Sequence, residues 1–186
     1  VALGWGMWRA PVVTRWWVAL GGAVCTLYGV RIPGFGRPKQ VPGVKSWFVG
    51  VAVATAVVVV PVTASGSPLH RDAGAWMLWL CAVTTLNAHA FDLWHREDDV
   101  RAGFRTLPVL LGAFGSRAAV TFGGAVLVVT GLVLRRPTIA DASLLVAIAL
   151  SLMALWTTPR RVRSAFDGWW IDGILLIPLL GRLVVH

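Results

Sequence analysis

The chain has 186 residues, of which 57% are hydrophobic and only 13% charged, with 11 tryptophans and a formal net charge of +9. This composition excludes an ordinary water-soluble domain. The basic excess does not indicate nucleic acid either, because most of it falls in alternate loops between apolar blocks, as in membrane proteins.

The apolar residues come in blocks of about 20, the length that a helix needs to cross the hydrocarbon core of a bilayer. They lack the period-two alternation of a transmembrane barrel. We therefore predict an all-α, polytopic transmembrane helix bundle of about six spans. The spans are expected near residues 12–30, 46–64, 73–91, 116–134, 139–157 and 169–185. The chain opens on "VALGWGMWRA", without an initiating methionine or a charged leader, so we expect no signal peptide and an internal start within a longer protein.

Basic residues mark one side of the predicted membrane protein. Sorting the loops by alternating sides brings eleven of the seventeen Lys and Arg residues together: Arg31, Arg37, Lys39, Lys45, Arg96, Arg101, Arg105, Arg117, Arg160, Arg161 and Arg163. By the positive-inside rule this side is cytoplasmic, and the loop after the third span lies on it. The basic rim suits anionic lipid headgroups or a phosphorylated substrate.

Carboxylates gather at the end of the third span. Of the eight acidic residues in the chain, four are Asp92, Glu97, Asp98 and Asp99. If the helix of this span continues through residue 99, its pitch places Asp92, His95 and Asp99 on one face. Magnesium suits such a group, because it bridges protein carboxylates to substrate phosphates. The alternative is a solvated loop in which the acids pair with neighbouring arginines.

The string "HREDDVRAGFRTLPVLLG" over residues 95–112 resembles the second aspartate-rich motif of the UbiA-type intramembrane prenyltransferases. That motif is D-x-x-x-D, followed after three residues by a glycine, and commonly by a basic residue, Ser or Thr, and L-P-V-x-x-G. The matching positions are Asp99, Gly103, Arg105, Thr106, Leu107, Pro108, Val109 and Gly112. His95 stands where the first aspartate is expected, and Asp92 lies one turn earlier. The first motif of the family, N-x-x-x-D-x-x-x-D, has no counterpart in the chain.

The resemblance covers nearly the whole chain. "TLYGVRIPGFGRPKQVPGVKSWFVG" resembles a span end, a basic loop and the next span of the family, and "AFDGWWIDGILLIPLL" resembles its last span. Three predicted spans precede the motif and three follow it, whereas the family has nine. We therefore expect residues 1–186 to form a single UbiA-like transmembrane domain that lacks its first three spans.

The resemblance implies a prenyltransferase, an enzyme that moves a prenyl group from an isoprenyl diphosphate to a lipophilic or aromatic acceptor within the membrane, with Mg²⁺ as cofactor. It implies Asp99 and Asp92 as catalytic metal ligands, with His95 a poor third because imidazole suits magnesium badly. The substrate-binding residues that it implies are Lys45, Arg105, Asn87, Tyr28 and Asp172. His89, in the third span, is expected to form a hydrogen bond between helices.

Other interpretations remain open. Lys45 and Arg105 could serve topology alone, and Asp172 could orient the acceptor, hold a metal-bound water or pair with an arginine. A non-catalytic relative that keeps the fold without a complete metal site is the alternative function, favoured by His95. A CDP-alcohol phosphotransferase would need D-G-x-x-A-R, which follows neither Asp167 nor Asp172.

Overall fold

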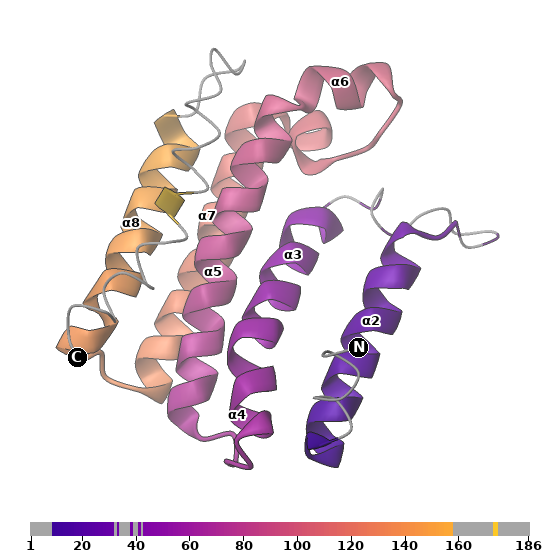
Figure 1. The fold of residues 1–186 in the computed structure, drawn as a ribbon. Coiled ribbons are helices and arrows are strands. Elements are labelled where there is room, and N and C mark those ends of the chain that lie inside the picture. The colour runs from indigo at the N-terminus through magenta and orange to yellow at the C-terminus, as the bar shows by residue number, and fades with distance from the viewer. Residues whose placement is uncertain are drawn as a thin grey trace.

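The computed structural model describes residues 9–31, 33, 38, 41, 43–157 and 173–174, and every regular element within them is helical. The all-α prediction is therefore confirmed. The elements are α2 (Val12–Gly29), α3 (Val44–Ala54), the π-helical turn η2 (Thr55–Val59), α4 (Val60–Ala64), α5 (Arg71–Trp94), α6 (Arg96–Arg101), α7 (Leu107–Leu134), the 3-10 turn η3 (Ile139–Asp141) and α8 (Ala142–Thr157) (Figure 1). Apart from residues 173 and 174, the predicted last span lies outside the described residues, and Asp172 lies outside them too.

The span at 116–134 begins earlier than its hydropathy predicts. Helix α7 starts at Leu107, with Pro108 in its first turn, where the missing N–H of proline costs no hydrogen bond. Gly112 interrupts the helix with a φ of +69°, a value that favours glycine. Residues 107–111, the last part of the motif-like string, therefore form a short helical segment before the span proper.

Within the part of the chain that the structure describes, two helices are long and apolar enough to cross a membrane, Val44–Ala64 and Leu107–Leu134, and Ala142–Thr157 is a shorter apolar helix. Only 28% and 17% of the most apolar windows of the two long helices are buried, whereas the core helix of a soluble protein would be mostly buried. Large apolar side chains stand on the outer surface, among them Phe114 and Phe122, each 74% exposed. A membrane protein exposes such surface to lipid.

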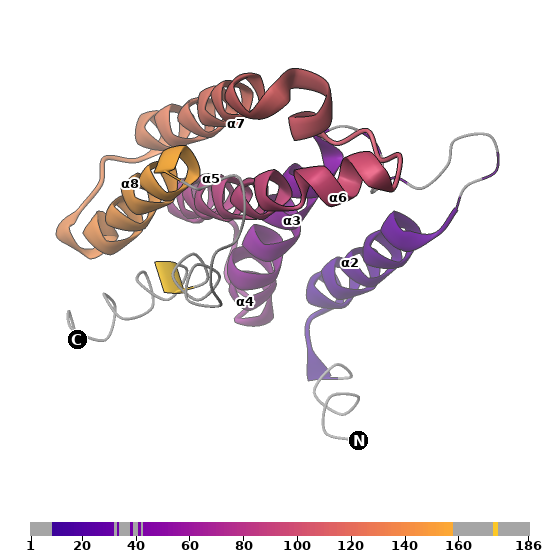
Figure 2. The ribbon, with the colours of Figure 1, turned by 90° about the horizontal axis from the view of Figure 1, so that it is seen from above.

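Helix α5 is the centre of the bundle and lies between α3 and α7, with α8 beside it (Figures 1 and 2). Its core residues include Trp79, Val83 and Leu86, all within 1% of complete burial. Two glycines let neighbouring helices approach it closely: a Cβ on Gly50 of α3 or on Gly131 of α7 would overlap side chains of α5. This packing fixes the end of α5 that carries Asp92.

Helix α2 lies at the edge of the bundle, next to α3 and α4 (Figure 2). Thr14 is the one buried residue in this helix, and its hydroxyl donates to Thr63 Oγ1 at 3.2 Å. The rest of α2 is left partly or fully exposed, so most of its surface is open to lipid or to other helices.

An ionic clamp closes the end of the bundle opposite to the motif. Arg135, after α7, lies 3.1 Å from Asp141 Oδ2 at the start of α8 and 3.7 Å from Asp72 Oδ1 at the start of α5. Asp141 also accepts hydrogen bonds from the backbone N–H and the hydroxyl of Thr138, both at 2.8 Å. The clamp ties three helix ends together.

Candidate functional site

The third span does not continue as one helix through residue 99, so that prediction is wrong. Helix α5 ends at Trp94, His95 has φ −84° and ψ 5°, and α6 begins at Arg96. Figure 1 shows α6 turned away from the axis of α5. The physical reason is that α6 consists almost entirely of charged residues and buries none of them, so no apolar face holds it in line with the bundle. Asp92, His95 and Asp99 consequently do not share one straight helical face.

Asp92 is a buried carboxylate whose two oxygens are both engaged. Lys45 Nζ lies 2.5 Å from Oδ1, and the hydroxyl of Ser46 donates to Oδ2 at 2.7 Å. Both partners belong to the first turn of α3. The side chain of Asp92 is 5% exposed and that of Lys45 is 43% exposed, so the pair runs from the bundle interior to the surface.

His89 extends this network inward by one helical turn. It is completely buried, and its Nδ1 lies 3.4 Å from Ser46 Oγ, as expected of a hydrogen bond between helices. Since the Ser46 hydroxyl donates to Asp92, its oxygen accepts from His89 when the histidine proton is on Nδ1. Nε2 of His89 then has no hydrogen-bond partner among the described residues.

Tyr28 and Asn87 occupy different surroundings. The ring of Tyr28, near the end of α2, stacks on Phe48 of α3 with centroids 4.1 Å apart, and Tyr28 is close enough to Asp92 to interact with it electrostatically. Asn87 is buried in α5, but five residues from Asp92 it points about 140° away around the helix. The structure thus brings Tyr28 toward the Asp92 network and directs Asn87 elsewhere.

Asp99 is held by the segment that follows it. The hydroxyl of Thr106 donates to Asp99 Oδ2 at 3.1 Å, and the N–H of Phe104 donates to the Asp99 carbonyl at 2.8 Å. Gly103, with φ +72°, makes the turn that brings these residues back. Asp99 is half-buried as a result.

Arg96 of the motif is partly buried, and its Nε donates to the Pro108 carbonyl at 2.9 Å, whereas the remaining charged residues face outward. Arg101 pairs with Asp98 at 3.2 Å and with Glu97 at 3.8 Å, and His95 Nδ1 lies 3.9 Å from Asp98 Oδ2. These are exposed pairs of the kind that the solvated-loop interpretation predicts. The four carboxylates of this region therefore divide into two groups: Asp92 and Asp99 are the inner pair, and Glu97 and Asp98 are at the surface. Arg105 is also exposed.

The two inner carboxylates lie at the same end of the bundle, where α3 and α7 begin. We call this end, formed by Gly43, Lys45, Asp92, Asp99 and Thr106, the mouth. Gly43, in the left-handed conformation directly before α3, packs against Leu107 so closely that an added Cβ would lie 3.2 Å from Leu107 Cδ1. Lys45 follows Gly43, and Thr106, which holds Asp99, precedes Leu107. This contact joins the start of α3 to the start of α7.

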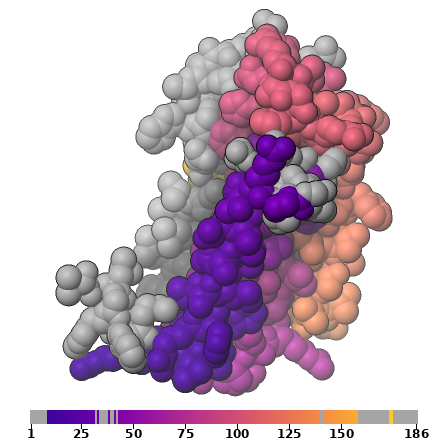
Figure 3. Space-filling model, turned by 90° about the vertical axis from the view of Figure 1, so that its right-hand side faces the viewer, coloured from indigo at the N-terminus to yellow at the C-terminus, as the bar shows by residue number. Residues whose placement is uncertain are grey.

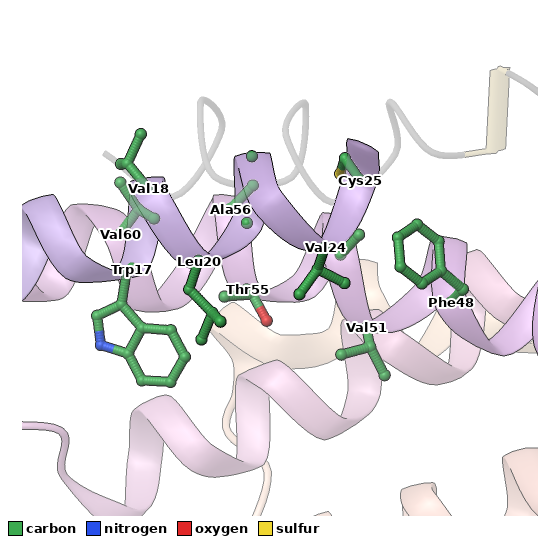
Figure 4. Close-up of a pocket in the computed structure, with 13 residues that line it drawn as sticks. Trp17, Val18, Leu20, Val24, Cys25, Phe48, Val51, Thr55, Ala56 and Val60 are labelled. Carbon is green, nitrogen blue, oxygen red and sulfur yellow. The ribbon is translucent and has the colours of Figure 1, made fainter. Parts of the chain in front are cut away.

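An apolar pocket of about 460 Å³ opens between α2 and the α3–α4 helix. Its walls include Trp17, Leu20 and Val24 from α2, and Phe48, Val51 and Val60 from the facing helix (Figure 4). Figure 3 shows α2 in front of these helices on this side of the molecule. Along α3 and η2, Lys45 is followed at intervals of three to four residues by Phe48, Ala52 and Ala56, which line the pocket. Lys45 therefore lies one helical turn before the row of residues that lines the pocket.

The donor set limits what metal the mouth can hold. No group of three or more His, Cys, Asp or Glu side chains suited to a metal ion occurs within the described ranges. Magnesium keeps several waters and commonly takes one or two carboxylates together with substrate phosphates. Asp99 fits that sparse requirement, whereas Asp92, with both oxygens engaged, does not.

Ser46 is a residue of the site that could not be predicted from the sequence. It follows Lys45 at the start of a span and belongs to no motif, so the only available signal was a small hydroxyl residue in the first turn of an apolar helix.

Comparison with known protein families identifies the family of the chain. The model described as UbiA prenyltransferase family matches residues 1–169. No curated protein and no solved structure is significantly similar to the chain.

Proposed function

Because the chain belongs to the UbiA prenyltransferase family, whose members are helical membrane proteins, we propose that it transfers a prenyl group from an isoprenyl diphosphate to a lipophilic or aromatic acceptor in a magnesium-dependent reaction. One observation carries this proposal. A carboxylate, Asp99, and an ammonium group, that of Lys45, lie at the same mouth of the bundle, and an apolar pocket begins one turn below Lys45.

The mouth would receive the diphosphate. Lys45 is partly exposed beside Asp92, and the exposed Arg105 follows the turn that holds Asp99. Asp99 would hold magnesium jointly with the phosphates, and the ion would supply neutralisation of the charge that develops on the leaving diphosphate. The hydroxyl of Thr106 keeps the Asp99 carboxylate in position for that contact.

The pocket between α2 and α3 would receive the prenyl chain. Burial of apolar carbon gains about 0.8 kcal/mol for each CH₂ group, so a pocket lined by Leu20, Val24 and Val51 favours an isoprenoid over a polar ligand. The same walls exclude water, which would otherwise react with an allylic cation after the C–O bond breaks. Head and tail sites are thus adjacent along α3.

We also propose the orientation and extent of the domain. The basic residues around the mouth favour the cytoplasmic side for it, in a multi-pass arrangement. The exposed surface of α2 supports the proposal that further spans, with the first aspartate-rich motif of the family, complete the domain.

A non-catalytic family member is the second candidate. The observation in its favour is that His95, at the position of a motif aspartate, is exposed beside Asp98 rather than turned toward Asp99. Such a protein would keep the apolar pocket and lose the response to magnesium.

Binding of geranyl diphosphate to the chain in nanodiscs, titrated with magnesium, tests the proposal. We expect magnesium to strengthen binding, and Asp99→Asn to remove most of that gain. Asp98→Asn is the matched control, because Asp98 is a neighbouring exposed carboxylate that should not respond. Binding that is indifferent to magnesium and to Asp99→Asn would favour the non-catalytic candidate.

A further inference from the structure

We propose that Lys45 is a built-in cation of the diphosphate site, held in place by Asp92, and that Asp92 does not ligate magnesium. The inference rests on the proposed function and assigns the two carboxylates of the mouth different tasks. Asp99 binds the metal ion, and Asp92 holds Lys45 in place.

Asp92 is almost completely buried. A carboxylate that is nearly removed from solvent needs a compensating charge and hydrogen bonds. Lys45 supplies the charge at Oδ1, and Ser46 supplies a hydrogen bond at Oδ2. A metal ion would have to displace one of these partners, and displacing Lys45 would leave an ammonium group without its carboxylate.

Lys45 pairs with Asp92 and is still partly exposed. An ammonium group has three N–H donors, and the ion pair with Asp92 Oδ1 occupies only one side of it. With 43% of the side chain exposed, the remaining donors are accessible to phosphate oxygens. Asp92 therefore orients a cation whose other side is open at the mouth.

Ser46 and His89 form a buried hydrogen-bond network behind Asp92. Ser46 is 1% exposed and donates to Asp92, and the fully buried His89 lies against the Ser46 hydroxyl. These contacts come from α3 and α5, which pack tightly at Gly50. Ser46 and His89 are thus positioning residues that fix the direction of the carboxylate and, through it, of Lys45.

Two independent cations would then face one diphosphate. The metal-dependent half lies at Asp99 and Thr106, and the metal-independent half at Asp92 and Lys45. Contact between Gly43 and Leu107 brings the halves together. Loss of one half should leave the other working, which makes the arrangement testable.

The test is the affinity for geranyl diphosphate of the chain in nanodiscs, measured across a magnesium titration. We expect Lys45→Met and Asp92→Asn to weaken binding about tenfold at every magnesium concentration, since each loses one charge-assisted contact, directly or through a misplaced lysine. The magnesium concentration at half-effect should stay unchanged. Lys45→Arg should restore part of the affinity, and Asp98→Asn should change nothing.

Asp92→Asn/Lys45→Met guards against misfolding, because it leaves no buried charge without a partner. It should unfold near the wild-type temperature and bind as weakly as Lys45→Met alone. The inference is overturned if Asp92→Asn raises the magnesium requirement as Asp99→Asn does, or if the double variant binds like wild type. If the wild-type chain binds no geranyl diphosphate with or without magnesium, the proposed function itself fails.

Discussion

Thr106 shows how one hydroxyl can prepare a carboxylate for a ligand. It occupies the N-cap position of α7 but makes no side-chain capping bond, and its hydroxyl donates to Asp99 instead. Replacing it with valine therefore removes the Asp99 contact without removing a helix cap.

Thr106→Val should weaken magnesium-dependent binding of geranyl diphosphate about fivefold, as expected for the loss of a hydrogen bond worth about 1 kcal/mol. Thr130→Val is the control, because that hydroxyl bonds only to the Val126 carbonyl of its own helix on the exposed surface. Equal affinities for Thr106→Val and wild type would show that Asp99 needs no such support.

At this scale the sequence was informative where residues form a continuous pattern. Asp99, Gly103 and Thr106 all belong to the motif-like string over residues 95–112. The structure brings them together where α6 leads into α7. Ser46 and its link to His89 were not found, because 43 positions separate the two residues and only the packing of α3 on α5 makes them neighbours.

At the scale of helices, hydropathy placed most of the described helices near their observed bounds but could not show the bend at His95. The pattern of apolar residues predicts which segments enter the membrane, but α6 contains a single apolar residue, Val100, so hydropathy gives no information on its direction. The turn at Gly112 escaped for another reason: its residues are apolar on both sides, so only the backbone conformation marks the interruption.

The clamp around Arg135 gives a prediction about helix packing. Asp141→Ala should lower the stability of the bundle by about 2 kcal/mol, because it removes a buried partner of Arg135 and the acceptor for Thr138. Asp72→Ala removes an exposed partner of the same arginine and should cost less than about 1 kcal/mol.

Thermal unfolding in nanodiscs measures both effects. Affinity for prenyl diphosphate should stay unchanged in Asp72→Ala, since the clamp lies at the end of the bundle opposite to the mouth. Equal unfolding temperatures for the two variants would mean that Asp141 contributes no more than a surface ion pair.

For the whole molecule, membrane character and family could be predicted from composition and one motif, because both are properties of local sequence. The family match over residues 1–169 confirms the resemblance, and the helical structure confirms the fold class. The pocket could not be predicted, because it lies between α2 and the α3–α4 helix, and no sequence pattern shows which helices are neighbours.

The central claim is that a prenyl diphosphate binds with its head at the mouth and its chain between α2 and α3. The most direct measurement is photo-crosslinking in nanodiscs with a prenyl diphosphate analogue that carries a diazirine at the far end of its chain, followed by peptide mapping. The account predicts labels within residues 17–25 and 51–60, removed by excess geranyl diphosphate. Labelling confined to the outer surface of α7, around Phe114 and Phe122, and unaffected by competitor would contradict it.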